Sequence, residues 1–240
     1  LSAGSIEKET ELRAIEILLE HRVEAMVVHS KALDDKTLID FSKQVPGFVL
    51  INRFIPEIAN RCVWLDNVTG GRLMAEHAIN QGHKKLAVIS SQYRIDDPNH
   101  RLEGIVNATE AAKLTLPESM IEYATPDQEG GELAMQNLLA TGAEFTAVLA
   151  YNDAMASGAM TMLQDHGIAV PEQVSVMGYD DVLLAKYCRP KLTTLRYPIE
   201  MMAAKAAELA LKYAAGAKPE EGLTFKYTPT IVKRDSVVRV

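Results

Sequence analysis

The sequence has few of the residues from which catalytic and metal centres are built. Its 240 residues include two cysteines and six histidines. Cys62 and Cys188 lie far apart and form no CxxC pair, which favours free thiols over a disulfide framework or a metal site. The sequence contains no HExxH, GxSxG or Walker-type motif, and no GxGxxG follows an apolar run. These absences disfavour an enzyme, and we expect neither a cofactor nor a bound metal.

Long apolar runs and positive charge are also scarce. No stretch approaches the roughly 18 apolar residues of a transmembrane helix. The 25 Lys and Arg residues are outnumbered by 32 Asp and Glu, which gives a net charge of −7. Because binding to phosphates needs a concentrated Lys/Arg surface, we expect that this segment alone does not hold nucleic acid. The composition is otherwise that of a soluble globular protein with no membrane partner, since 48% of the residues are hydrophobic.

Short apolar runs alternate with amphipathic stretches along the chain. This alternation predicts an α/β fold in which helices cover both faces of parallel sheets. In such doubly wound sheets, ligands bind beyond the carboxyl ends of the strands. The predicted strands are residues 25–28, 48–51, 85–89, 120–123, 145–150 and 174–177. The predicted helices are residues 5–22, 35–43, 70–81, 100–112, 131–139 and 154–166.

Polar residues directly follow three of the predicted strands. They are the pairs Asn52-Arg53, Asn152-Asp153 and Asp180-Asp181. In a parallel sheet these positions point toward one crevice. Amide and carboxylate oxygens accept hydrogen bonds from neighbouring hydroxyls, and an Arg fork donates to two acceptors. The pattern therefore indicates a sugar site.

Each of these residues also has a simpler structural interpretation. Asp153 fits the N-cap of the following helix better than a ligand contact, so we place it outside the site. Asn152 equally fits a turn, and Asp181 a surface acid or a cap. Asp180 favours function, because a carboxylate at a strand end is costly to bury unless a group donates to it. From its position alone, Arg101 fits an exposed ion pair as well as a ligand contact.

Several blocks resemble the lactose and galactose repressor family of transcription regulators, in order and almost from end to end. The blocks are residues 65–67, 81–85, 101–104, 150–159, 171–181 and 190–198. Closer similarity to the galactose-repressor branch lies in residues 49–53, 196–198 and 229–234.

The resemblance implies a type I periplasmic-binding-protein-like fold, with two doubly wound parallel-sheet lobes joined by a three-strand hinge. The first lobe would comprise residues 1–65 and 196–226, and the second residues 66–195 and 227–240. Leu1–Gly4 resembles the tail of a strand. We therefore expect the N-terminal βα unit to be missing from the chain, together with a helix-turn-helix DNA-binding domain. The hinge would pass through Leu65, Asp66, Leu195, Arg196, Lys226 and Tyr227.

The resemblance also implies a cytoplasmic, bacterial, homodimeric repressor. A galactose-type sugar would bind between its lobes and allosterically change its affinity for operator DNA. Asp127 is a weaker candidate for the effector site, because the lactose-repressor branch carries an aromatic residue there. The effector-binding residues carried over from the family are Asn52 and Arg53 in the first lobe, Arg101, Asn152 and Asp180 in the second, and Tyr197 at the junction.

Three alternatives remain at this point. A periplasmic sugar-binding protein of a transporter would share the fold without regulation. A Rossmann-like sugar or nucleotide enzyme is more remote, because no phosphate loop or nucleophile–base pair is found. Within the repressor interpretation, a purine effector would also suit Arg101 and Asp180.

Overall fold

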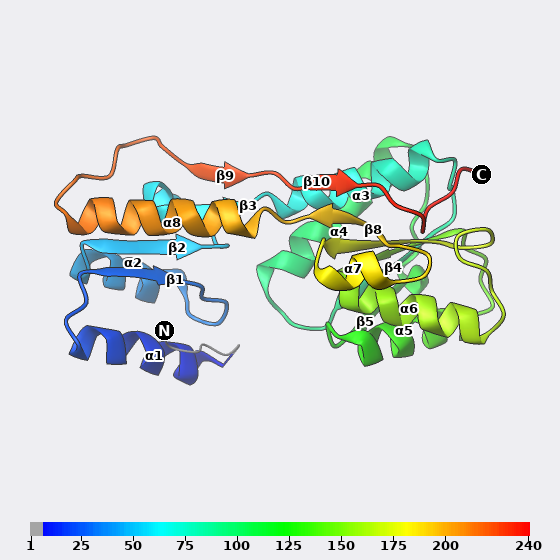
Figure 1. The fold of residues 1–240 in the computed structure, drawn as a ribbon, viewed down its shortest axis with the longest axis horizontal. Coiled ribbons are helices and arrows are strands. Elements are labelled where there is room, and N and C mark those ends of the chain that lie inside the picture. The colour runs from blue at the N-terminus through cyan, green and yellow to red at the C-terminus, as the bar shows by residue number, and fades with distance from the viewer. Residues whose placement is uncertain (1–6) are drawn as a thin grey trace. The chain divides into compact units, whose positions relative to one another are not determined.

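The computed structural model describes residues 7–240, and its chain divides into two compact units (Figure 1). Unit 1 runs to Asp66 and resumes over Pro198–Tyr227, and unit 2 comprises Asn67–Tyr197 and Thr228–Val240. The divisions predicted from the sequence, after residues 65, 195 and 226, lie one or two residues from these positions. The predicted strand tail at Leu1–Gly4 lies outside the described residues.

Unit 1 is built around a parallel sheet with the strand order β1-β2-β3-β9 over its described residues. Every residue of β2 is buried, as expected for an apolar strand covered on both faces. Helix α8 joins this unit from far along the chain and packs on β2. The elements are α1 (Lys8–Glu20), β1 (Ala25–Val28), α2 (Asp35–Gln44), β2 (Gly47–Ile51), the short 3-10 helix η1 (Pro56–Arg61), β3 (Cys62–Leu65), α8 (Ile199–Ala214) and β9 (Phe225–Tyr227).

Unit 2 has a sheet with the strand order β10-β8-β7-β6-β4-β5. Its strands are parallel to their neighbours except β10, which runs antiparallel to β8. The strands are β4 (Leu86–Ser91), β5 (Ile121–Ala124), β6 (Ala147–Ala150), β7 (Ser175–Asp180), β8 (Thr193–Arg196) and β10 (Thr230–Val232). The helices are α3 (Asn67–Asn80), α4 (Asp96–Ala111), η2 (Glu118–Met120), α5 (Gln128–Ala140), α6 (Asp153–Asp165) and α7 (Leu183–Tyr187).

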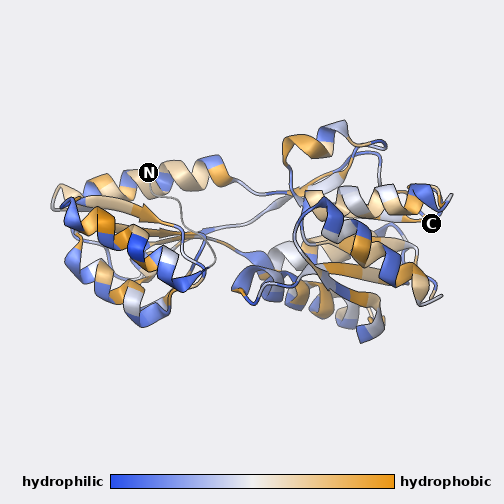
Figure 2. Cartoon of the chain, turned by 90° about the horizontal axis from the view of Figure 1, so that it is seen from below, coloured by the Kyte–Doolittle hydropathy of each residue, from blue (hydrophilic) through white to orange (hydrophobic). Residues whose placement is uncertain are grey.

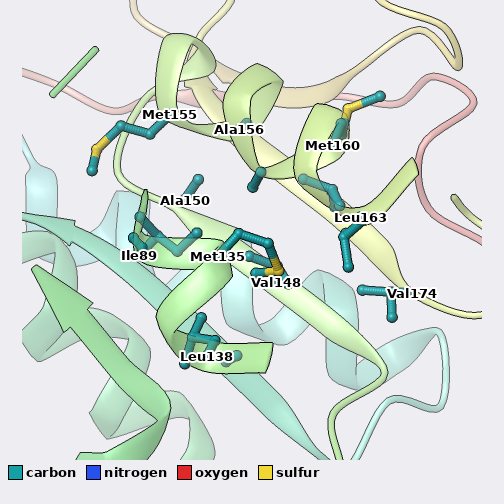
Figure 3. Close-up of a cluster of buried hydrophobic side chains, with 14 of the residues drawn as sticks. Ile89, Met135, Leu138, Val148, Ala150, Met155, Ala156, Met160, Leu163 and Val174 are labelled. Carbon is teal, nitrogen blue, oxygen red and sulfur yellow. The ribbon is translucent and has the colours of Figure 1, made fainter. Parts of the chain in front are cut away.

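One hydrophobic cluster of unit 2 lies between the sheet and helices α5 and α6. Met135 and Leu138 of α5, and Leu163 of α6, are fully buried with Val148 of β6 (Figure 3). Figure 2 colours the chain by hydropathy and shows strands that are mainly hydrophobic and helices that carry both hydrophobic and hydrophilic residues. The apolar runs that predicted strands thus form the sheet, which is the inner layer of the unit.

The predicted helices and strands all occur, with shifted boundaries. The largest shift is in α4, which begins at Asp96, four residues before the predicted start at His100. Asp96, Asp97 and Pro98 occupy its first turn, where acids complement the helix dipole and proline costs no hydrogen bond. The earlier start places Arg101 in the second turn instead of at the helix entrance.

Two further searches bear on function. Over residues 7–240, no helix combines the length and apolar character needed to cross a bilayer. Within the same residues, no group of three or more His, Cys, Asp or Glu side chains is arranged to hold a metal ion.

Candidate functional site

The site in unit 2 is centred on Arg101, which α4 carries into the interior. Arg101 is only 7% exposed. Its backbone lies directly against Gly71 of α3, where an added Cβ would come within 1.9 Å of the Arg101 carbonyl oxygen. Any larger residue at position 71 would therefore push the two helices apart. Glycine at position 71 thus allows α4 to lie close to α3 at Arg101.

The Arg101 guanidinium is held on several sides. Its Cζ lies 3.5 Å from the ring centroid of Tyr179 and 4.5 Å from that of Tyr151, both in cation–π geometry. Nε donates to Asn67 Oδ1 at 2.9 Å, and Nη1 donates to the Tyr151 carbonyl at 2.6 Å. Burial alone lowers the pKa of Arg101, but Asp180 and the two tyrosines raise it overall. The guanidinium is therefore a fixed, permanently charged donor.

Asp180 lies beside this cation, at the carboxyl end of β7. Its Oδ1 is 3.6 Å from Arg101 Nη2, within ion-pair distance but beyond a good hydrogen bond. Its side chain is 29% exposed, against 8% for Arg101, so the carboxylate is the accessible partner. Burial raises the pKa of Asp180 although Arg101 opposes the shift. This carboxylate keeps acceptor capacity for a ligand with several hydroxyl groups.

Tyr197 is brought to the same place by the end of β8. Its backbone N–H donates to the Asp180 carbonyl at 3.4 Å, which continues the β7–β8 pairing. Burial raises the pKa of the Tyr197 phenol, and the charges of Asp97 and Asp180 add to the shift while Arg101 opposes it. Arg101, Asp180 and Tyr197, which the family resemblance implied as effector contacts, therefore lie together in unit 2.

Asn152 occupies the N-cap position predicted for Asp153. Asn152 is the N-cap of α6: its Oδ1 accepts from the Met155 N–H at 2.8 Å, and its Nδ2 donates to the Pro126 carbonyl at 2.9 Å. The prediction that Asp153 is the cap is wrong. Asp153 is the first helical residue, 1% exposed, and its carboxylate bonds to other elements. Both residue types cap helices well, so the sequence could not decide between adjacent positions.

Asp127 and Asp181 also have structural partners. Asp127 is the N-cap of α5, where Oδ1 accepts from the Gly130 N–H at 2.7 Å and the Thr125 hydroxyl at 3.0 Å. The side chain of Asp181 is 5% exposed and is paired with Arg196 and Arg234, so it is neither a surface acid nor a cap. The Oδ1 of Asp127 is therefore occupied by the cap of α5.

Asn52 and Arg53 belong to unit 1, where they follow β2. Asn52 has a positive φ of 57°, and its carbonyl accepts from Lys31 Nζ at 3.0 Å. The Arg53 guanidinium donates to the Leu33 carbonyl and to Asp35 Oδ1, each at 2.7 Å. The loop between β1 and α2 and the first residue of α2 thus hold the side chain of Arg53.

The residues predicted as hinge lie at strand ends. In unit 1, Leu65 of β3 is paired in register with Tyr227 of β9. Lys226 Nζ forms an ion pair with Asp66 Oδ2 at 3.0 Å in the same unit. In unit 2, Leu195 is fully buried in β8, and Arg196 Nε donates to Asp181 at 2.7 Å. Their role as a hinge stays a prediction.

Three residues around Arg101 were not predicted as part of the site. Tyr151 and Tyr179 each stand one position before a predicted polar residue, and strand-end aromatics would have been the signal for them. Asn67 lies in one of the blocks that carry the family resemblance, but its bond to Arg101 spans 34 positions. Its Nδ2 also donates to Asp97 Oδ1 at 3.2 Å, which extends the network.

Comparisons with known proteins agree with this architecture. The family described as Periplasmic binding protein-like domain matches residues 75–237. The HTH-type transcriptional regulator GalS of Salmonella typhimurium strain LT2 is 48% identical over 231 residues, covering 96% of this chain and 68% of the relative. The HTH-type transcriptional regulator GalR of Escherichia coli strain K12 is 45% identical over 234 residues, covering 98% and 68%.

Solved structures show the same fold. A sugar-binding transcriptional regulator of the LacI family from Escherichia coli, crystallised with phosphate, superimposes with a TM-score of 0.89 at 28% identity, over 97% of this chain and 83% of that one. The two parallel sheets are therefore those of a periplasmic-binding-protein-like α/β fold. The chain belongs to the LacI family of transcriptional regulators, in which it forms the effector-binding domain of a GalR/GalS-like repressor and not an enzyme.

Proposed function

We propose that the effector of this domain is a galactose-type sugar, which Arg101, Asp180, Asn152 and Tyr197 bind from unit 2. Asn52 and Arg53 are the proposed contacts from unit 1. The observation that carries the proposal is the pairing of an accessible carboxylate, Asp180, with a buried and immobilised cation, Arg101. The proposed branch of the family follows from the GalS and GalR relatives.

The arrangement suits a polyol better than an anion or an apolar ligand. Asp180 offers carboxylate oxygens to neighbouring hydroxyls, and charge-assisted bonds of this kind are stronger than neutral ones. The charge of Arg101 is balanced by that carboxylate, and its guanidinium lies against the rings of Tyr151 and Tyr179, which leaves less attraction for a phosphate than an unpaired arginine would offer. The sugar is bound and released unchanged.

Sugar binding is proposed to act on operator DNA through an allosteric coupling. Such couplings typically amount to about 1–3 kcal/mol and are reciprocal, so operator DNA would alter sugar affinity by the same factor. These 240 residues carry a net charge of −7, which disfavours DNA binding by this segment itself. We therefore assign DNA contact to a helix-turn-helix segment outside this sequence. The proposed repressor is a homodimer that acts in the cytoplasm.

The test is a calorimetric titration of the intact protein with D-galactose, D-fucose, D-glucose, lactose and a purine. We expect D-galactose or its close analogue to bind in preference to the others. Asp180→Ala should weaken that binding by about a hundredfold, the equivalent of losing two charge-assisted hydrogen bonds. Glu144→Ala is the matched control, because it removes a carboxylate of the same unit that is 82% exposed.

The outcomes separate the parts of the proposal. Binding of galactose that Asp180→Ala leaves unchanged would refute the site. Selective binding of the purine would refute the sugar while leaving the family assignment in place.

A further inference from the structure

Asp153 is a buried carboxylate that the proposed ligand contacts do not use. It is 1% exposed at the first position of α6. Its Oδ1 accepts from the Thr194 hydroxyl at 2.5 Å, and its Oδ2 accepts from the Val182 N–H at 2.9 Å. Val182 follows β7 and Thr194 lies in β8, so one side chain joins three elements of unit 2.

The space for this carboxylate is made by Gly178 of β7. An added Cβ at Gly178 would lie 2.3 Å from Asp153 Oδ1, which is closer than any real contact. The strand therefore leaves a gap at this position, and the Asp153 side chain fills it. The fit is specific to a small strand residue opposite a short acid.

The segment between Gly178 and Val182 carries the proposed ligand carboxylate in an unfavourable backbone conformation. Asp180 has a φ of 106° and Asp181 a φ of 57°, both in the region that favours glycine. Such conformations are strained in residues other than glycine and persist only where their surroundings hold them. Asp153 holds the backbone directly after these two residues, through the N–H of Val182.

We propose that Asp153 is a positioning residue for effector binding: its bonds to Val182 and Thr194 hold the turn at Asp180–Asp181 so that the Asp180 carboxylate stays beside Arg101. The inference rests on the proposed function and adds to it a residue that does not touch the sugar. It also explains why the strained backbone at Asp180 persists, because Asp153 of the same unit holds the residue that follows the turn.

Asp153 interacts electrostatically with Asp180 as well as through the backbone of the turn. Asp180 and Asp181 face it from the turn, and Cys188 lies beyond α7. Burial raises the pKa of Asp153 to about 7, and the two neighbouring carboxylates add to the shift although both hydrogen bonds oppose it. A neutral amide can make the same two bonds, because it accepts from the Val182 N–H and donates to the Thr194 oxygen.

The first test compares Asp153→Ala and Asp153→Asn in the intact protein by titration with D-galactose. Asp153→Ala should weaken binding about tenfold, whereas Asp153→Asn should stay within about threefold of the original affinity. The double variant Asp153→Ala/Asp180→Asn should bind D-galactose little more weakly than Asp180→Asn alone, because Asp153 acts through Asp180. Equal, additive losses in every variant would overturn the proposal.

The control is Ser175→Ala at the opposite end of β7. Ser175 is also 1% exposed, and its hydroxyl oxygen accepts from the Val238 N–H at 3.1 Å, so the substitution removes a comparable buried bond. It should lower the stability of unit 2 without changing galactose affinity. An equal loss of affinity in Ser175→Ala would show that Asp153 acts only through general stability.

A second measurement needs no ligand and decides the positioning claim even if no sugar binds. Amide hydrogen exchange at residues 180–184 should accelerate in Asp153→Ala and stay slow in Asp153→Asn and Ser175→Ala. If Asp153→Ala does not fold, Thr194→Val removes one of the two bonds with little change of shape and should show a smaller acceleration. Unchanged exchange in this segment would refute the positioning role, whereas absent sugar binding would refute the proposed function.

Discussion

Two carboxylates with little exposed surface, Glu11 in unit 1 and Asp153 in unit 2, have pKa values shifted in opposite directions. Glu11 is 5% exposed and Asp153 is 1% exposed. Burial is the largest influence on both and raises the pKa of each acid, yet the pKa of Glu11 ends below its ordinary value while that of Asp153 rises to about 7. Burial alone therefore does not decide whether an acid stays ionised.

The difference lies in what surrounds each group. Glu11 accepts from the Ser30 hydroxyl at 2.5 Å and from the backbone N–H groups of Lys31, Ala32 and Leu33 at 2.8 to 3.2 Å. Such a ring of donors favours the charged form. Asp153 has one hydroxyl and one N–H, and two other carboxylates lie nearby. The hydrogen-bond donors lower the pKa of Glu11 in unit 1, whereas desolvation and like charge raise the pKa of Asp153 in unit 2.

Removing the acid from unit 1 should have the largest effect on stability. Glu11→Ala leaves buried backbone donors without an acceptor, which should cost about 3 kcal/mol of unfolding free energy. The same loop accepts from Arg53 through the Leu33 carbonyl, so Arg53 should also become more mobile. Urea unfolding followed by circular dichroism measures the loss. Glu16→Ala, whose side chain on the same helix is 45% exposed, is the control and should have little effect.

Replacing each acid by its amide should separate the two sites. Both oxygens of Glu11 face N–H donors, so the amide nitrogen of Glu11→Gln would oppose one of them, at a cost of about 1–2 kcal/mol. In Asp153→Asn the amide nitrogen faces the Thr194 hydroxyl, which can turn to accept. We expect little loss of unfolding free energy there. Equal destabilisation by both amides would contradict the explanation of the opposite pKa shifts.

The two acids should give the stability opposite slopes against pH. Because the pKa of folded Glu11 lies below its ordinary value of 4.5, its contribution is present above pH 4.5 and is lost as the pH falls through the folded value. Folded Asp153 instead retains a proton that the unfolded chain releases above its ordinary value of 3.8. Its contribution therefore declines as the pH rises from 3.8 to about 7.

The measurement is the unfolding free energy of the protein minus that of Glu11→Gln or Asp153→Asn, from pH 3.5 to pH 8 in steps of about half a unit. The first difference should rise with pH and then level off. The second should fall with pH and level off above about 7. A second difference that does not change with pH would show that the pKa of Asp153 is the same in the folded and the unfolded chain.

The sequence predicts the sheets far better than it predicts these acids. Apolar runs such as 48–51 identify buried strands locally, and the end of a strand identifies Asp180 as a ligand candidate. The partners of Asp153 lie 29 and 41 positions away, and those of Glu11 lie 19 to 22 positions away. Local periodicity contains no information at that separation, and glycine at position 178 gains its meaning only once β7 and α6 are adjacent.

The exposed carboxylate of Glu144 provides the lower limit of the comparison. It pairs with Lys85 across the surface of unit 2, and its side chain is 82% exposed. The hydrogen bond from Lys85 lowers the pKa of Glu144, as donors do for Glu11. However, water already solvates an exposed carboxylate, and salt screens an exposed pair. Glu144→Gln should therefore leave the midpoint of thermal unfolding unchanged within error, at low salt and at high salt. A loss comparable to that of Glu11→Gln would mean that the number of donors, and not their combination with burial, sets the contribution of an acid to this fold.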